Sequence, residues 1–162
     1  AEALARLYEG FDAQLVITGM AQEDVDRISS APTVAIASDG SSLRSTGPLS
    51  AGKPHPRSYG TFPRFLSMVR ETNLVSLEEA IRKMTSLPAE RLKLTRRGRL
   101  SPGQFADVVV FDSNEVRDVA TFESPHEYSE GINHVLVNGT AVVSDGKPTG
   151  KRPGRVLRSS TE

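Results

Sequence analysis

Hydrophobic and polar positions follow two alternating patterns over residues 1–40. Two stretches with helical spacing, ALARLYEGF and AQEDVDRISS, are each followed by an apolar run, LVITG and TVAIAS. Helix and strand patterns that alternate in this way are typical of parallel βα units. The second apolar run, residues 33–38, is apolar on both faces from Val34 to Ala37. We therefore expect it to be a strand inside a sheet that helices cover on both sides.

The middle of the chain predicts a long loop followed by helices. Residues 39–62 are rich in glycine, proline and serine, which predicts an irregular loop of a length that is usually functional or mobile. Pro63 is expected to open an amphipathic helix that runs to about residue 71. The capping-box pattern at residues 76–79 predicts the start of the next helix. Pro88 should end or interrupt that helix before a short one through Arg91.

The pattern changes to β after Leu94. Residues 106–112 form an apolar strand pattern, and two further strand patterns, residues 132–137 and 140–143, flank Asn138-Gly139. Asn-Gly between two such patterns is a strong signal for a two-residue hairpin turn. This half of the chain is therefore expected to form a small antiparallel β unit. The tail from residue 145, rich in glycine, proline and basic residues, is expected to be a meandering or frayed terminus.

Composition excludes several classes of partner. The 162 residues carry 20 basic and 20 acidic side chains, so charge suggests neither a nucleic acid nor a membrane as a partner. The apolar runs are far shorter than the roughly 20 residues of a membrane-spanning helix. The first residues lack the basic and apolar regions of a signal peptide. The absence of cysteine excludes disulfides and thiolate metal sites in these residues. It fits a reducing compartment and is equally compatible with an exported, cysteine-free protein; of the two we expect a cytoplasmic protein.

Five segments carry a resemblance to a known family. GRLSPGQFADVVV (residues 98–110) and HVLVNG (residues 134–139) together resemble the C-terminal signature of the amidohydrolase superfamily. Three more segments follow Ser38-Asp39-Gly40 in an order that resembles the D-aminoacylase branch, the N-acyl-D-amino-acid deacylases. They are HPRSYGTFPR (residues 55–64), KMTSLPA (residues 83–89) and PGRVL (residues 153–157). The resemblance covers nearly the whole chain.

The resemblance implies an α/β fold: the C-terminal portion of a (β/α)8 metal-dependent hydrolase barrel plus part of a small antiparallel β-sandwich. On this view residues 1–94 contain the last βα units of the barrel, with an active-site loop at 39–62. Residues 95–162 contain the C-terminal part of the sandwich domain and the tail. A complete barrel needs about 200 residues or more. The chain therefore corresponds to a fragment of the family pattern, or to one chain of a split or processed enzyme.

Asp39 is the candidate catalytic residue. It follows directly after the expected strand of residues 33–38, at the carboxyl end, where (β/α)8 enzymes place catalytic side chains. The resemblance implies that Asp39 takes a proton from a metal-bound water and then protonates the leaving amine. Without the resemblance, the dipeptide Asp39-Gly40 is more typical of a simple turn.

The expected loop carries four further candidates. Arg57 is suited to bind the free carboxylate of an N-acyl amino acid in a bidentate manner, although a solvated or structural arginine is an equal alternative. Tyr59 and Ser41 are weaker candidates for lining a substrate pocket. His55 has no second ligand at metal-binding spacing, so we expect it to pack in the loop or to support the site from a second shell.

His126 and His134 are expected to be surface and strand residues of the β unit.

The resemblance implies zinc as the cofactor, with its ligands upstream and none in this chain. The function expected is that of a segment of a metal-dependent amidohydrolase that converts N-acyl-D-amino acids into a carboxylate and a D-amino acid. The chain alone is expected to be inactive and to need the remainder of the barrel or a second chain. The alternatives are another amidohydrolase, similar to dihydroorotase or hydantoinase, and a non-catalytic scaffold or oligomerisation module. Unpaired barrel edges would favour a homo-oligomer.

Overall fold

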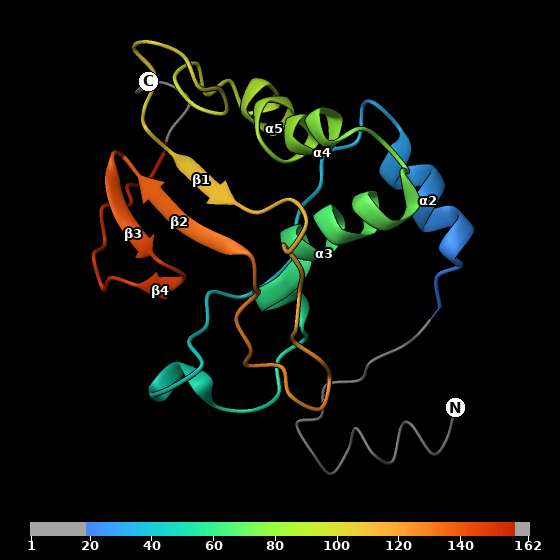
Figure 1. Cartoon of the computed structure of the whole chain (residues 1–162), viewed down its shortest axis with the longest axis horizontal. Coiled ribbons are helices and arrows are strands. Elements are labelled where there is room, and N and C mark those ends of the chain that lie inside the picture. Colours follow the sequence, from blue (N-terminus) through green and yellow to red (C-terminus); the bar gives the residue numbers. More distant parts are fainter. Residues whose placement is uncertain (1–18, 158–162) are drawn as a thin grey trace.

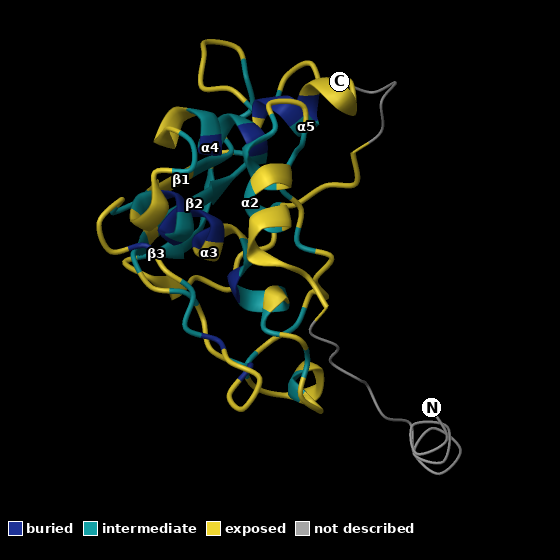
Figure 2. Cartoon of the chain, turned by 90° about the vertical axis from the view of Figure 1, so that its right-hand side faces the viewer, coloured by how far each residue is buried: buried dark blue, intermediate teal, exposed yellow. Residues whose placement is uncertain are grey.

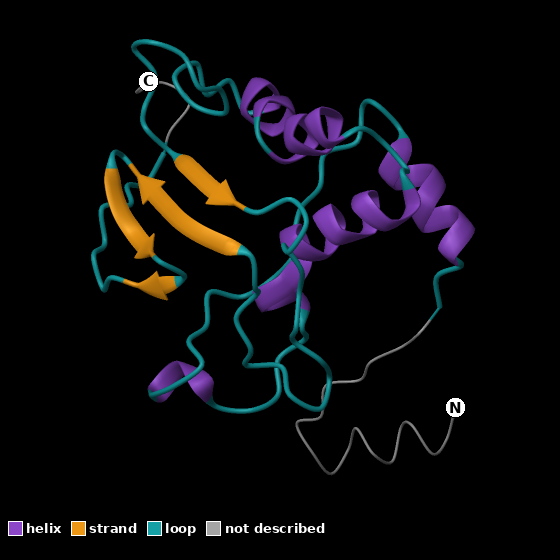
Figure 3. Cartoon of the chain, in the orientation of Figure 1, coloured by secondary structure: helices purple, strands orange, loops and turns teal. Residues whose placement is uncertain are grey.

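The computed structural model describes residues 19–157, with the α-helices on one side and a small β-sheet on the other (Figures 1 and 3). The helices are α2 (Gln22–Ser30), the 3-10 helix η1 (Pro48–Ser50), α3 (Arg57–Thr72), α4 (Leu77–Met84) and α5 (Ser86–Arg91). The strands are β1 (Val108–Phe111), β2 (Ile132–Val137), β3 (Thr140–Ser144) and β4 (Lys147–Pro148). No helix in residues 19–157 is long and apolar enough to cross a membrane. The helix and strand expected within residues 1–18 lie outside the described residues.

The sheet is antiparallel throughout, with the strand order β1-β2-β3-β4. Asn138 and Gly139 connect β2 to β3 with φ values of 48° and 77°. A two-residue turn of this kind requires positive φ at both positions, which Asn and Gly tolerate. The expected hairpin and the antiparallel β unit are therefore confirmed. The strand expected at residues 106–112 is shorter, because only Val108–Phe111 pairs with β2.

Helix α3 begins at Arg57 rather than at Pro63, so residues 57–62 of the expected loop are helical. The side chain of His55 explains the early start, because its Nδ1 accepts a hydrogen bond from the backbone N–H of Arg57 at 3.1 Å. Pro63 lies inside the helix and has no N–H to offer the carbonyl of Tyr59 one turn earlier. The hydroxyl of Ser129 donates to that carbonyl instead, at 3.0 Å. A contact distant in sequence thus makes an internal proline tolerable.

Helices α4 and α5 follow the local signals in their sequence. The Ser76 side chain accepts a hydrogen bond from the backbone N–H of Glu79 at 3.2 Å, which confirms the N-terminal cap of α4. Thr85 separates α4 from α5. Pro88 lies within the first turn of α5, where its missing N–H leaves no helical bond unmade. The expected short helix through Arg91 is therefore confirmed, but the expectation that Pro88 ends the preceding helix is wrong, because that helix ends at Met84 and Pro88 lies inside α5.

Residues 33–38 do not form the expected strand, and none of the described strands pairs with them. The segment is anchored to α4 by Lys83 instead. The backbone N–H of Ile36 donates to the carbonyl of Lys83 at 3.1 Å, and the Nζ of Lys83 donates to the carbonyls of Ala31 and Val34, the latter at 2.9 Å. An extended apolar segment needs a neighbouring strand to form a ladder. Here the Lys83 side chain binds the carbonyl of Val34 within the segment and that of Ala31 just before it.

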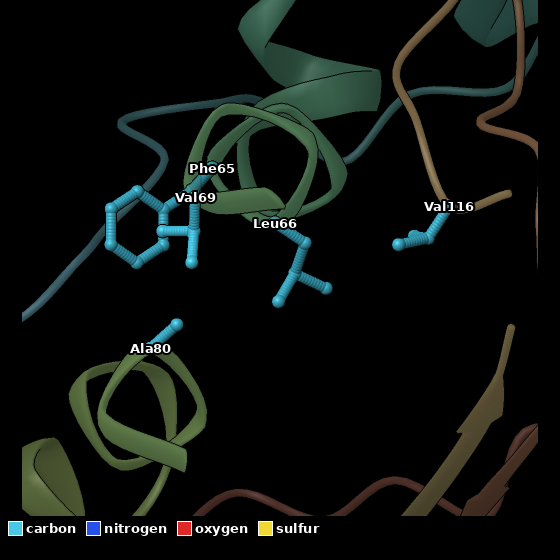
Figure 4. Packing of buried hydrophobic residues seen from close by; sticks show 5 residues of the cluster. All are labelled: Phe65, Leu66, Val69, Ala80 and Val116. Atoms are coloured by element: carbon cyan, nitrogen blue, oxygen red, sulfur yellow. The ribbon is translucent and has the colours of Figure 1, made fainter. Parts of the chain in front are cut away.

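The hydrophobic core lies between α3, α4 and the first two strands. Figure 4 shows its centre, which consists of Phe65, Leu66, Val69, Ala80 and Val116. Phe111 of β1 and Ile132 of β2 pack against these residues. The buried residues concentrate in α3, α4 and α5 (Figure 2). The helical half and the β half therefore share one core, which fixes α3 and the loops at its N-terminal end.

Candidate functional site

Asp39 and Arg57 lie together at the start of α3. Asp39 ends the extended segment with a φ of 48°, and its Oδ2 is 3.2 Å from Nη2 of Arg57. The Asp39 side chain is 87% exposed and that of Arg57 is 45% exposed, so both are open to a ligand. Gly40 allows this approach. A Cβ there would lie 2.9 Å from Cα of Ser58 and 3.2 Å from the carbonyl oxygen of Arg57, too close for any other residue.

A pocket of about 370 Å³ lies beside this ion pair. It is lined by Ser38, Gly40, Ser41, Ser42, Leu43, Ser58, Tyr59 and Tyr128. Two of the sequence candidates, Ser41 and Tyr59, are thus brought into one wall, and the Ser41 N–H donates to the Ser58 hydroxyl at 3.2 Å. Asp39 and Arg57 themselves do not line the pocket, but their chain neighbours do. The lining is rich in hydroxyl groups, which suits a polar ligand.

His55 supports the helix that carries Arg57. Besides the bond from its Nδ1 to the Arg57 N–H, its ring meets that of Phe122 edge to face, with centroids 5.0 Å apart. Desolvation, followed by the positive charges of Arg57 and Arg64, lowers the pKa of His55 from its ordinary value. The neutral imidazole is therefore favoured, and in that form Nδ1 can accept the hydrogen bond.

Tyr59 is held by a residue that the sequence did not single out. Its hydroxyl is 2.9 Å from Nδ1 of His126, and the two rings meet edge to face. His126 is half-buried in the loop before β2, rather than on the surface or in a strand. Desolvation and then Tyr128 raise the pKa of Tyr59, which keeps its hydroxyl protonated. His134 lies on β2, as expected. A contact between residues 67 positions apart leaves no local signal in the sequence.

The described residues do not supply a metal site. In residues 19–157, no three histidine or carboxylate side chains lie close enough together to hold a metal ion. Asp39 pairs with a cation, and His55 uses its Nδ1 to cap α3. The donor set needed for zinc, three or four nitrogen, sulfur or oxygen ligands, is therefore not met by this part of the chain.

Comparison with known proteins shows one family. Residues 8–143 match the model of the amidohydrolase family. The chain is 49% identical over 140 residues to the N-acyl-D-aspartate deacylase of Alcaligenes xylosoxydans xylosoxydans, covering 85% of this chain and 26% of that protein.

Solved structures agree with this match. A D-aminoacylase crystal structure that defines a novel subset of amidohydrolases superposes with a TM-score of 0.73 at 45% identity, covering 82% of this chain and 27% of that one. The N-acyl-D-glutamate deacylase of Bordetella bronchiseptica, complexed with zinc and a phosphonate inhibitor that mimics the tetrahedral intermediate, gives a TM-score of 0.68 at 43% identity. That match covers 80% of this chain and 27% of the deacylase. The chain thus spans about a quarter of the length of the proteins it matches.

Proposed function

This chain belongs to the amidohydrolase family, and from that membership we propose that it forms part of an enzyme that hydrolyses N-acyl-D-amino acids to a carboxylate and a D-amino acid. The observation that carries the proposal is the Asp39–Arg57 pair beside a polar pocket. In this pair Asp39 is a group that can transfer protons, and Arg57 is a group that can bind a carboxylate. The similarity to deacylases of N-acyl-D-aspartate and N-acyl-D-glutamate supports the substrate class.

Asp39 is the proposed general base and acid. Its exposed carboxylate takes a proton from the water that attacks the amide carbonyl, and the resulting carboxyl group gives that proton to the leaving amine. A positioned carboxylate in such a role contributes about 10²- to 10⁴-fold to the rate. The left-handed backbone at Asp39 and the close packing of Gly40 on α3 hold this carboxylate in place.

Arg57 is the proposed anchor for the carboxylate of the substrate. A guanidinium has five N–H donors, so Arg57 can bind a substrate carboxylate in a bidentate manner while it remains close to Asp39. This contact makes the enzyme require an amino acid rather than any amide. Ser41 and Tyr59, which line the pocket, are proposed to contact the rest of the substrate. His55 acts indirectly, since it caps the helix that presents Arg57.

The remaining parts of the enzyme belong to the same proposal. We place residues 1–94 in the last βα units of a (β/α)8 barrel and residues 95–162 in the C-terminal part of a β-sandwich and the tail. The proposed cofactor is zinc, with ligands from a part of the enzyme outside this chain; the zinc-bound deacylase supports this metal. The partner that completes the site is the rest of the barrel, and the cytoplasm is the proposed location.

The test uses the full-length protein with added zinc. N-acetyl-D-methionine and its L-enantiomer are compared for the unsubstituted protein, for Asp39→Asn and for Asp145→Asn. Asp145 is a matched control because it is 88% exposed, has a φ of 50° and precedes a glycine, but lies at the β3–β4 turn. We expect hydrolysis of the D-substrate alone, lost in Asp39→Asn and kept in Asp145→Asn.

Other results would decide against the proposal. Hydrolysis of a hydantoin or dihydroorotate, with none of N-acetyl-D-methionine, would show another amidohydrolase. Inactivity of the full-length protein on every substrate would favour a scaffold. Equal activity of Asp39→Asn and the unsubstituted protein would remove Asp39 from the mechanism.

A further inference from the structure

A loop from the β half of the chain, residues 121–130, lies beside the loop of residues 39–56 that leads to the candidate site (Figure 1). Three contacts join them. The Phe122 ring meets that of His55, the Tyr128 hydroxyl lies 3.5 Å from the Ser45 N–H, and His126 reaches Gly52. We call residues 121–130 the supporting loop.

The supporting loop also contacts α3 at Tyr59 from two sides. The Ser129 hydroxyl donates to the Tyr59 carbonyl, which Pro63 leaves without a helical partner. His126 contacts the Tyr59 hydroxyl at the far end of the same side chain. Both ends of a residue that lines the pocket are therefore bound by one loop, which fixes the position of its ring.

His126 joins two elements through its two ring nitrogens. Nε2 is 3.0 Å from the carbonyl oxygen of Gly52, which can only accept, so Nε2 must carry a hydrogen. In the neutral imidazole Nδ1 is then the acceptor, and the Tyr59 hydroxyl donates to it across 2.9 Å. One side chain thus orients Tyr59 and holds the loop at Gly52.

We propose that His126 is a positioning residue for substrate binding, acting through the hydroxyl of Tyr59 and not on the reacting atoms. The proposal rests on the function proposed above for the pocket. Within residues 19–157, the hydrogen bonds and ring contacts of His126 are made with Tyr59 and Gly52, and not with Asp39 or Arg57. In this proposal proton transfer therefore does not depend on His126. Its loss releases the Tyr59 ring and weakens binding, while the chemical step is retained.

The test is a double-mutant cycle in the full-length protein, with N-acetyl-D-methionine as the substrate. The variants are His126→Ala, Tyr59→Phe and the two together. We expect each single variant to raise KM about fivefold, the worth of one hydrogen bond, with kcat within about twofold. The double variant should show no further rise in KM, because each change already removes the contact between Tyr59 and His126 through which His126 is proposed to act. Additive effects, an unchanged KM or a fall in kcat alone would overturn the proposal.

Conservative variants separate the two contacts of His126. In His126→Asn the side-chain oxygen can replace Nδ1 as the acceptor for Tyr59, whereas in His126→Gln the amide nitrogen can replace Nε2 as the donor to Gly52. We expect KM to return towards the original value in His126→Asn but not in His126→Gln. The opposite order would contradict the role of Tyr59. His134→Gln, on β2, is the control and should leave both kinetic constants unchanged.

Trypsin cleavage after Arg44 tests the supporting contact without any activity. Arg44 lies in the loop of residues 39–56 and is exposed. We expect faster cleavage there in His126→Ala than in His134→Ala, at equal thermal stability. Equal cleavage rates would refute the supporting contact even if the enzyme proves to act on another substrate. If His126→Ala is cleaved faster but the unsubstituted full-length protein does not hydrolyse N-acetyl-D-methionine, the supporting contact stands and only the proposed function is contradicted.

Discussion

The carboxylate of Asp39 lies 3.2 Å from the guanidinium of Arg57, at the point where the extended segment meets the first turn of α3. Two residues with separate expected roles are thereby placed in one ion pair. A substrate whose carboxylate binds Arg57 would have its amide bond close to Asp39. In the function proposed above, this geometry would connect recognition of the amino acid at Arg57 with proton transfer at Asp39.

The first prediction concerns the charge of Asp39. Asp39→Asn keeps the shape of the side chain but cannot take a proton, so kcat should fall by about 10²- to 10⁴-fold while KM changes little. Steady-state kinetics of the full-length protein with N-acetyl-D-methionine measure this. A rise in KM with unchanged kcat would instead assign Asp39 to binding.

The second prediction concerns Arg57. Arg57→Lys keeps the charge but loses the bidentate geometry, and Arg57→Met loses both, so KM should rise in that order, by about tenfold or more in Arg57→Met. Arg64→Met, on the same helix and 77% exposed, is the matched control. If the two methionine variants behave alike, Arg57 has no special role in binding the substrate.

The third prediction concerns Gly40. In Gly40→Ala the new Cβ would lie 2.9 Å from Cα of Ser58. This atom belongs to the backbone of α3 and cannot move unless the helix moves too. The segment must therefore shift away from the helix and carry Asp39 out of reach of Arg57. We expect kcat to fall while the thermal unfolding temperature stays within a few degrees. Gly154→Ala is the control, since a Cβ there meets nothing within 4 Å and its φ is not positive, so kcat should stay unchanged.

Local signals in the sequence predicted the parts of the fold that local interactions determine. Ser76 caps α4 through its own side chain, and Asn138-Gly139 forms a turn that these two residues favour by their backbone preferences. The sequence made Asp39 and Arg57 candidates for two separate roles, and the structure brings their side chains within 3.2 Å of each other.

Contacts between distant residues account for what the sequence did not predict. The early start of α3 depends on His55, and its internal Pro63 depends on the hydroxyl of Ser129. The carbonyls of Ala31 and Val34 accept hydrogen bonds from Lys83 rather than from a neighbouring strand. Each of these partners is an ordinary polar residue at a position without periodic pattern, so its role becomes visible only once the chain is folded.

The fourth prediction concerns the titration of His55. Its pKa is lowered in the folded state, so at pH values below the ordinary 6.5 the unfolded state binds more protons and stability falls as the pH falls. In His55→Asn the side-chain oxygen can accept from the Arg57 N–H without titrating. Urea unfolding at about pH 7.5 and about pH 5 should show a loss of stability in the unsubstituted protein relative to His55→Asn. Parallel changes in both proteins would contradict this.

The fifth prediction concerns Lys83, which is fully buried and donates to the carbonyls of Ala31 and Val34. Lys83→Met fills the same space but leaves both carbonyls without a donor, so the free energy of unfolding should fall by about 1–3 kcal/mol. Lys147→Met, at an exposed position of β4, should change it little.

The stabilisation that Lys83 contributes should depend on pH, in a direction that follows from its pKa. Burial lowers the pKa of Lys83, so between its folded and unfolded pKa values the unfolded state binds more protons. Stability should therefore rise with pH through that window, which ends near the ordinary value of about 10.4. The difference in unfolding free energy between the unsubstituted protein and Lys83→Met should be larger at about pH 10 than at about pH 7. A difference that is constant or shrinks with pH would show that folding does not lower the pKa of Lys83.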